Sequence, residues 1–117
     1  LAFGTPGGDQ QDQWSVQFLL NVIDFSMDLQ EALDAPTVQT THFPGSFYPH
    51  ASDPGGCRVE ARITPEVRSE LEALGHKVQV DGAWSHGQVT AVAYEPASGV
   101  VSGAASPRGR VAYVMGR

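Results

Sequence analysis

The stretch FGTPGGDQQDQW, Phe3 to Trp14, decides how the chain begins folding. A proline and two glycines predict a loop over Gly4–Gly8, and the residues before it can end a strand. Asp9 or the residues just after it can cap a helix. From about Gln11 to Phe25, apolar residues recur at helical spacing over a wide arc, which predicts a helix covered on more than one side.

Two interpretations of the Gly7–Gly8 pair are open at this point. The pair is either an ordinary strand-to-helix turn, or a loop whose backbone amides face a negatively charged group. Glycine suits the second role because it tolerates positive φ and lets a ligand approach the backbone closely. A helix that follows the loop adds a dipole that favours negative charge at its first turn.

Composition describes a globular chain and excludes some classes of partner. The 117 residues are 41% hydrophobic, which suits a single domain over residues 1–117 or a piece of a larger protein. Seven basic and thirteen acidic residues give a net charge of −6. We therefore expect neither nucleic acid nor an anionic membrane as partner, because both attract clustered Lys and Arg. Cys57 is the only cysteine, so no internal disulfide can form.

The ends of the chain and its hydropathy give few clues to location. No apolar run approaches the ~20 residues that span a bilayer. The start, LAFGTPGG, lacks the features of a signal peptide and does not begin with Met, so we interpret the chain as a piece of a longer protein. The compartment stays undetermined, and we expect a soluble protein, with the cytoplasm favoured over the periplasm or secretion.

Local signals predict the remaining elements. Asp28 and Glu31 match a capping box, and Pro65 and Gly75 suit the first position and the end of a second clear helix. We expect helices over residues 28–34 and 65–74, strands over 36–42, 57–63 and 76–80, a long loop over 43–56, a hairpin over 88–106 with its turn at 96–99, and a short strand within 110–116. In the strand over 57–63, Val59, Ala61 and Ile63 would share one face. This order predicts an α+β domain with an antiparallel sheet.

Several segments together resemble one family. GTPGGDQQ (4–11), LLNVIDFSMDLQEALDAP (19–36), HFPGSFYP (42–49), LEALGHKV (71–78) and GAASPRG (103–109) are similar to the C-terminal half of the small subunit of gamma-glutamyltranspeptidases, in order and at compatible spacing. The match covers essentially the whole chain and is nearest to the gamma-glutamyltransferase-like branch of bacterial enzymes.

The resemblance implies a fold and a reaction. The fold is a fragment of the N-terminal-nucleophile hydrolase αββα sandwich, with mainly antiparallel sheets and packed helices. A precursor cleaves itself to expose a threonine, which attacks a gamma-glutamyl amide such as glutathione, and the acyl group passes to water or an amine. Gly7 and Gly8 would supply the oxyanion amides, and the carboxylate of Asp9 beside them would alter substrate preference.

The resemblance also implies what the fragment lacks. The nucleophilic threonine and the groups that bind the glutamyl moiety should lie upstream, and Thr5 sits in a loop without a free amino group. We therefore expect this polypeptide alone to be inactive and to need the large subunit and the N-terminal half of the small subunit as partners. Alone, its uncovered apolar faces would drive homo-oligomer formation.

The other chemical candidates are weaker. His42, His50, Cys57, His76 and His86 show no zinc-site spacing, so we expect no metal, no cofactor and a structural Cys57. The default for Trp14 and Trp84 is core packing, with a ligand cage as the alternative. Through the resemblance, Ser85 and His86 are weak candidates for the edge of the substrate site. The same resemblance gives Arg108 a structural hydrogen-bonding role.

The sequence therefore leaves readings of different classes open. One is a fragment of a gamma-glutamyl transferase or hydrolase, and the second is a non-catalytic module that binds an anion at the glycine loop. An acylase of related amide substrates is a third, because the residues that select the acyl group should lie upstream.

Overall fold

The computed structural model describes residues 1–108 and 112–116 and divides into two compact units. The first comprises Leu1–Ala35 and Gly87–Arg117, and the second is Pro36–His86. The prediction of one domain over residues 1–117 stays a prediction. Within the described residues, no helix has the length and apolar character needed to cross a membrane.

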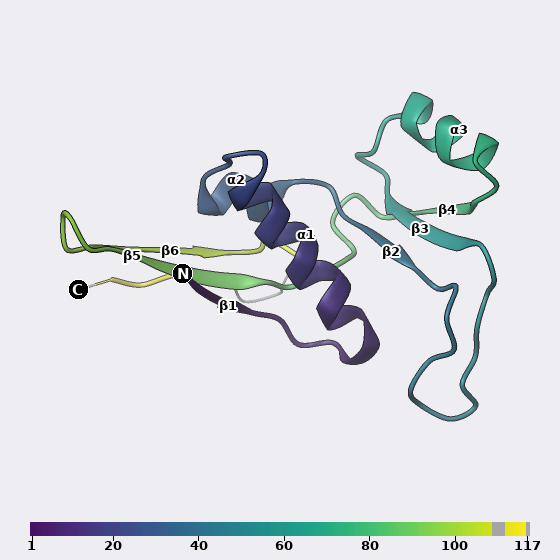
Figure 1. The fold of residues 1–117 in the computed structure, drawn as a ribbon, viewed down its shortest axis with the longest axis horizontal. Helices are drawn as coiled ribbons and strands as arrows, with labels where there is room; N and C mark the ends of the chain where they lie inside the picture. The colour runs from purple at the N-terminus through teal and green to yellow at the C-terminus, as the bar shows by residue number, and fades with distance from the viewer. Residues whose placement is uncertain (109–111, 117) are drawn as a thin grey trace. The chain divides into compact units, whose positions relative to one another are not determined.

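The first unit is an antiparallel sheet with two helices. Its strands lie in the order β1-β5-β6, and Figure 1 shows α1 and α2 over this sheet. The elements are β1 (Ala2–Gly4), the short 3-10 helix η1 (Gly8–Gln10), α1 (Gln11–Ile23), α2 (Leu29–Asp34), β5 (Thr90–Glu95) and β6 (Val100–Ala105). The predicted hairpin with its turn at residues 96–99 is confirmed, and Gly99 in that turn has φ +70°.

The core of the first unit lies between its helices and its sheet. Phe18 of α1 is 2% exposed and its ring centroid lies 5.1 Å from that of Phe3 in β1. The other buried members of this cluster are Ala32, Leu33, Val89, Ala91 and Ala104, and Trp14 is among the partly buried residues packed against it. Small alanines on the strands let the helices approach the sheet closely.

Helix α1 is shorter and less covered than the sequence predicts. It ends at Ile23, and Phe25 beyond it is 69% exposed. Phe18 is its one buried residue among those described, while Val16 and Leu20 are 53% and 43% exposed. Within this unit α1 packs against both β1 and α2, and the side of the helix that carries Val16 and Leu20 is left exposed.

The capping box predicted for α2 is confirmed. The Asp28 side chain accepts a hydrogen bond from the Glu31 amide at 2.8 Å, and the Glu31 side chain accepts one from the Asp28 amide at 3.2 Å. These two bonds satisfy donors that a helix start otherwise leaves unpaired, so this six-residue helix begins where its sequence predicts.

The second unit is a three-stranded sheet with one helix. It contains β2 (Val38–Thr40), β3 (Gly56–Glu60), α3 (Pro65–Ala73) and β4 (Lys77–Asp81), with strand order β2-β3-β4. β2 pairs antiparallel with β3, but β3 pairs parallel with β4. The sheets are mainly antiparallel, as predicted, and β3 with β4 is the one parallel pair among the described strands: α3 carries the chain back between these two strands, so they run in the same direction.

Two predicted strands also differ from the structure. β3 stops at Glu60, so Ala61, which is exposed, and Ile63 fall outside it. In the C-terminal stretch, residues 112–116 form no strand, and residues 110 and 111 lie outside the described residues. The helix predicted from Pro65 is confirmed, with Gly75 at φ +96° just beyond its end.

Candidate functional site

The glycine loop of the first unit joins β1 to η1 and α1. Gly7 has φ +134° and Gly8 has φ +57°, so two consecutive residues have backbone conformations that favour glycine. The Thr5 carbonyl accepts a 2.7 Å hydrogen bond from the Gln11 side chain, which ties the loop to the first turn of α1. The loop therefore combines two positive-φ glycines with a hydrogen bond to the start of α1.

The amides of Gly7 and Gly8 are available to a ligand. Both residues are exposed, and neither amide has a hydrogen-bond acceptor among the described residues. They come just before α1, whose N-cap residue Gln10 makes no side-chain capping bond. Free amides and the helix dipole favour a negatively charged group at this loop.

Acidic side chains next to the loop oppose that preference. Asp9 follows the two glycines in the exposed 3-10 turn η1, and Asp12 lies in the first turn of α1. A carboxylate here stabilises the helix start but repels a second anion. Any anion held at this loop therefore depends on close backbone hydrogen bonds.

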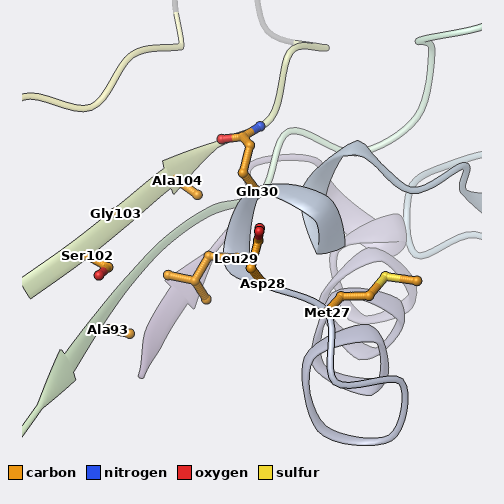
Figure 2. A pocket seen from close by; sticks show the side chains of 8 residues that line it. All are labelled: Met27, Asp28, Leu29, Gln30, Ala93, Ser102, Gly103 and Ala104. Carbon is orange, nitrogen blue, oxygen red and sulfur yellow. The ribbon is translucent and has the colours of Figure 1, made fainter.

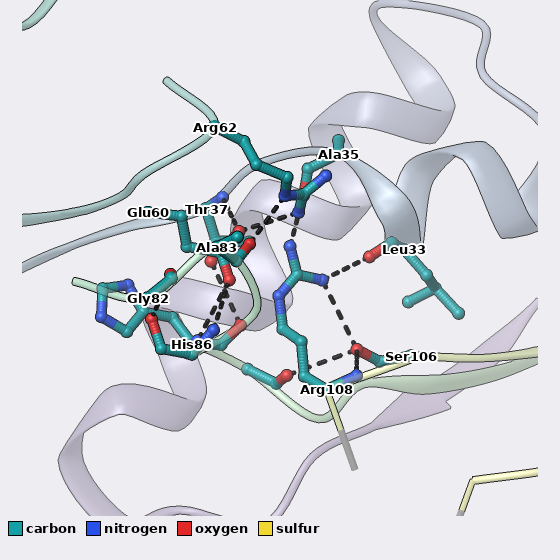
Figure 3. A network of polar contacts seen from close by, with 12 residues as sticks. Leu33, Ala35, Thr37, Glu60, Arg62, Gly82, Ala83, His86, Ser106 and Arg108 are labelled. Atoms are coloured by element: carbon teal, nitrogen blue, oxygen red, sulfur yellow. Dashed lines mark hydrogen bonds and ion pairs between the residues drawn. The ribbon is translucent and has the colours of Figure 1, made fainter. Parts of the chain in front are cut away.

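Ser85 and His86 lie in the second unit, around a carboxylate that sequence reasoning missed. Glu60 at the end of β3 is fully buried. Its Oε1 accepts hydrogen bonds from the amides of Ser85 (2.9 Å) and His86 (3.2 Å). Its Oε2 accepts from the Thr37 amide at 3.2 Å and from the Arg62 guanidinium at 2.8 Å (Figure 3). The Glu60 carboxylate thus holds Thr37, the residue just before β2, and residues 85 and 86 at the end of the turn that follows β4.

A second carboxylate holds the His86 side chain. Nε2 of His86 lies 2.7 Å from Oδ2 of Asp81, and the imidazole is 5% exposed. Asp81 also accepts two hydrogen bonds from Arg58, at 2.7 and 3.0 Å. The hydrogen bond from Arg58, supported by the one from His86, holds the pKa of the Asp81 carboxyl below its usual range.

Side-chain hydrogen bonds also hold residues 82–86, the turn that follows β4. The Ser85 hydroxyl donates to the Gly82 carbonyl at 2.7 Å, and Arg62 donates to the Ala83 carbonyl at 2.7 Å. The role of Ser85 and His86 at the edge of a substrate site stays a prediction. The one sequence signal for Glu60 was its place in a β-rich segment between two arginines, and nothing in it distinguished a buried carboxylate from an exposed one.

The two tryptophans have different environments. Trp14 packs against the core of the first unit, as predicted. Trp84 is 45% exposed, and the Arg62 guanidinium lies 3.5 Å from its ring centroid, so core packing is wrong for Trp84. Its ring stacks on a cation at the surface of its unit.

Arg108 of the first unit makes structural hydrogen bonds. Its guanidinium donates to the carbonyls of Leu33 (2.5 Å) and Ala35 (2.7 Å) at the end of α2 (Figure 3). Its amide donates to the hydroxyl of buried Ser106 at 3.3 Å. Arg108 therefore caps carbonyls that a helix end leaves without partners, in line with its predicted role.

Other possible sites offer little chemistry. Burial raises the pKa of the Cys57 thiol, which disfavours the reactive thiolate. Across residues 1–108 and 112–116, no three His, Cys, Asp or Glu side chains gather closely enough to hold a metal ion. A pocket of about 430 Å³ lies beside α2, where Leu29 reaches toward β5 and β6 (Figure 2). Its one carboxylate, Asp28, is engaged in the capping box.

Comparisons with known proteins identify the class. The chain is 31% identical over 111 residues to the glutathione hydrolase-like YwrD proenzyme of Bacillus subtilis (strain 168), covering 93% of this chain and 20% of that protein. It is 35% identical over 105 residues to the acylase ACY 1 proenzyme of Pseudomonas sp. (strain V22), covering 90% and 16%. The solved structure of LmbA2991HD superposes with a TM-score of 0.92 at 50% identity, covering 99% of this chain and 21% of that one.

The fold is that of an N-terminal-nucleophile hydrolase, as the resemblance predicted: mixed α+β, with helices packed on largely antiparallel sheets. The gamma-glutamyltranspeptidase family model matches residues 1–115, and the chain belongs to that family. It spans about a fifth of the length of the relatives it matches.

Proposed function

We propose that the chain is the C-terminal part of the small subunit of a gamma-glutamyl transferase or hydrolase, and that it supplies the oxyanion amides. The family match over residues 1–115 carries this proposal. The exposed, unpaired amides of Gly7 and Gly8 support it further, because an oxyanion hole needs backbone donors that no protein acceptor occupies.

The chemistry assigns distinct tasks to the chain and to the rest of the protein. A threonine outside the 117 residues attacks the gamma-glutamyl carbonyl, and the carbonyl oxygen becomes an oxyanion in the tetrahedral intermediate. The amides of Gly7 and Gly8 donate hydrogen bonds to that oxygen, and these hydrogen bonds become stronger as negative charge develops on it. Asp9 borders the same loop and disfavours substrates with a negative group there. Ser85 and His86 are proposed to contribute to the edge of the substrate site.

The first experiment is the mass of the full gene product, mapped for internal cleavage. The expected result is two subunits, the smaller beginning with threonine and containing residues 1–117. A single uncleaved polypeptide without threonine-dependent amidase activity would overturn the enzymatic proposal. It would favour the alternative, a non-catalytic module that binds an anion at Gly7 and Gly8.

The second experiment tests the loop, with a matched control for backbone strain. Valine at Gly8 (φ +57°) forces the loop to change conformation, and valine at Gly99 (φ +70°) imposes similar strain in the β5–β6 turn. We expect Gly8→Val to lower kcat per cleaved molecule on a gamma-glutamyl anilide by about 10²-fold, within the range for one lost oxyanion donor. Gly99→Val should keep kcat. Equal losses would show that the oxyanion role is wrong.

An acylase acting on related amides is the second candidate. The observation that favours it is 35% identity to the acylase ACY 1 proenzyme, against 31% to the glutathione hydrolase-like proenzyme. The same loop would serve both reactions, because both pass through an oxyanion. Comparing kcat/KM of the full gene product on glutathione and on a beta-lactam side-chain amide separates the two.

We also propose that residues 1–117 alone associate with themselves. Val16, Leu20 and Ile23 are 53%, 43% and 63% exposed at the i, i+4, i+7 spacing of one helix stripe. An apolar stripe of this kind favours association. Light scattering of the isolated polypeptide should give a mass above that of one chain, and a monomer at high concentration would contradict the proposal.

A further inference from the structure

We propose that Trp14 is a positioning residue for the oxyanion loop: its indole fixes the backbone of Gly7, and through it the two amides. This inference rests on the proposed function and adds a residue that neither the sequence motif nor the family resemblance assigns. It is carried by the contacts of the indole with two glycines of the first unit.

The six-membered part of the indole lies directly against Gly7. A Cβ atom on Gly7 would lie 2.5 Å from Cζ3 of Trp14 and 3.1 Å from Cη2, distances that leave no room for a side chain. The near end of the same side chain lies against buried Gly87, where a Cβ would be 3.2 Å from Cγ. The ring therefore occupies the space beside two glycines, at φ +134° and φ +79°.

The shape of the ring, and not its N–H group, makes these contacts. Nε1 of Trp14 is buried and has no hydrogen-bond acceptor among the described residues. A buried donor without an acceptor opposes stability, so this polar group does not explain a tryptophan here. What the residue offers instead is a flat apolar surface that reaches from the α1 core to the loop.

A glycine at φ +134° needs such support. With no Cβ, Gly7 has a wide choice of backbone conformations, so its own sterics do not hold the loop in one of them. The indole is anchored to a helix and packs against the core cluster, so it restricts the loop from the protein side. Oxyanion donors act through preorganisation, and a loop that loses this restriction loses transition-state stabilisation more than substrate binding.

The test uses the full gene product and substitutions that separate the two ends of the indole. Trp14→Phe keeps the Cβ and Cγ atoms that face Gly87 but removes the atoms that face Gly7. We expect kcat to fall about tenfold with KM within about twofold of wild type. Replacing Trp14 with benzothienylalanine, which keeps the bicyclic shape without the N–H, should restore kcat.

Phe18→Leu is the matched control, because Phe18 lies on the same helix, is buried in the same core and contacts Phe3. It should lower the thermal midpoint while keeping kcat per cleaved molecule. Wild-type kcat in Trp14→Phe, or an equal fall in kcat in Phe18→Leu, would overturn the positioning role. If Trp14→Phe does not fold, the benzothienylalanine variant decides: wild-type kcat supports the shape contact, and a loss overturns it.

The same series separates this inference from the proposed function. A loss of kcat in Gly8→Val together with wild-type kcat in Trp14→Phe leaves the oxyanion loop intact and overturns only the role of Trp14. Wild-type kcat in Gly8→Val overturns the oxyanion loop, and the positioning role falls with it.

Discussion

Replacing Glu60 with glutamine removes a buried charge without changing the shape of the side chain. In the folded protein, each carboxylate oxygen of Glu60 accepts at least two hydrogen bonds: Oε1 from the amides of Ser85 and His86, and Oε2 from the Thr37 amide and Arg62. Glutamine keeps one carbonyl oxygen and places an NH2 group opposite the other pair of donors. Whichever way the amide is turned, two donors lose their acceptor.

The expected cost follows from that count. Each buried donor left without an acceptor costs about 1–3 kcal/mol, so the loss of two should lower local stability by about 2–6 kcal/mol. Amide hydrogen exchange of the full gene product measures this loss of local stability residue by residue. A loss near 3 kcal/mol corresponds to about 10²-fold faster exchange, since about 1.4 kcal/mol is a factor of ten. The amides of Ser85 and His86 should exchange faster by this factor, and the amides of β5 and β6 should exchange as in the wild type.

Glu72→Gln is the control, because Glu72 lies on α3 of the same unit and is exposed. It makes the same chemical change where solvent can replace any lost contact, so exchange should stay as in the wild type. Unchanged protection of the Ser85 and His86 amides in Glu60→Gln would refute the claim that this carboxylate holds the 82–86 turn.

Two further predictions concern titrating groups. The hydrogen bond from Arg58 lowers the pKa of Asp81, so its stabilising contribution is complete above the ordinary carboxyl pKa of about 4 and is lost as the pH falls through the lower folded value. Asp81→Asn should therefore have a lower denaturation midpoint than wild type at pH 7, and the gap should narrow as the pH falls below about 4 towards the lowered pKa of Asp81; a gap of constant size over this acid range would contradict this. Burial raises the pKa of the Cys57 thiol, so iodoacetamide at pH 8 should alkylate it more slowly in folded than in urea-unfolded protein, and equal rates would show that the thiol is accessible.

The elements that the sequence predicted well are those defined by neighbouring residues. Asp28 and Glu31 start α2 through hydrogen bonds that span three residues, and the Gly99 N–H closes a hairpin turn by donating a hydrogen bond to the Glu95 carbonyl at 2.8 Å. Pro65 begins α3 because its missing N–H costs nothing at a helix start.

Contacts between residues distant in the sequence decided the strand pairing and the burial of the tryptophans, which the hydrophobic pattern could not predict. Strand periodicity shows which side chains share a face, but it names no partner strand, so the parallel pairing of β3 with β4 was not predicted. Trp14 and Trp84 are the same residue type, and only packing makes one a core residue and the other an exposed partner of Arg62.

The amino-acid sequence by itself determined the family, the order of elements, the glycine loop and the capping box of α2, because each depends on residue identity at short spacing. Tertiary structure alone decided that Glu60 is buried among hydrogen-bond donors, that Asp81 holds His86 and that Trp14 lies against Gly7. The physical reason is that a charge or ring gains its role from groups brought close only by folding, and a buried carboxylate is stable only where those donors converge.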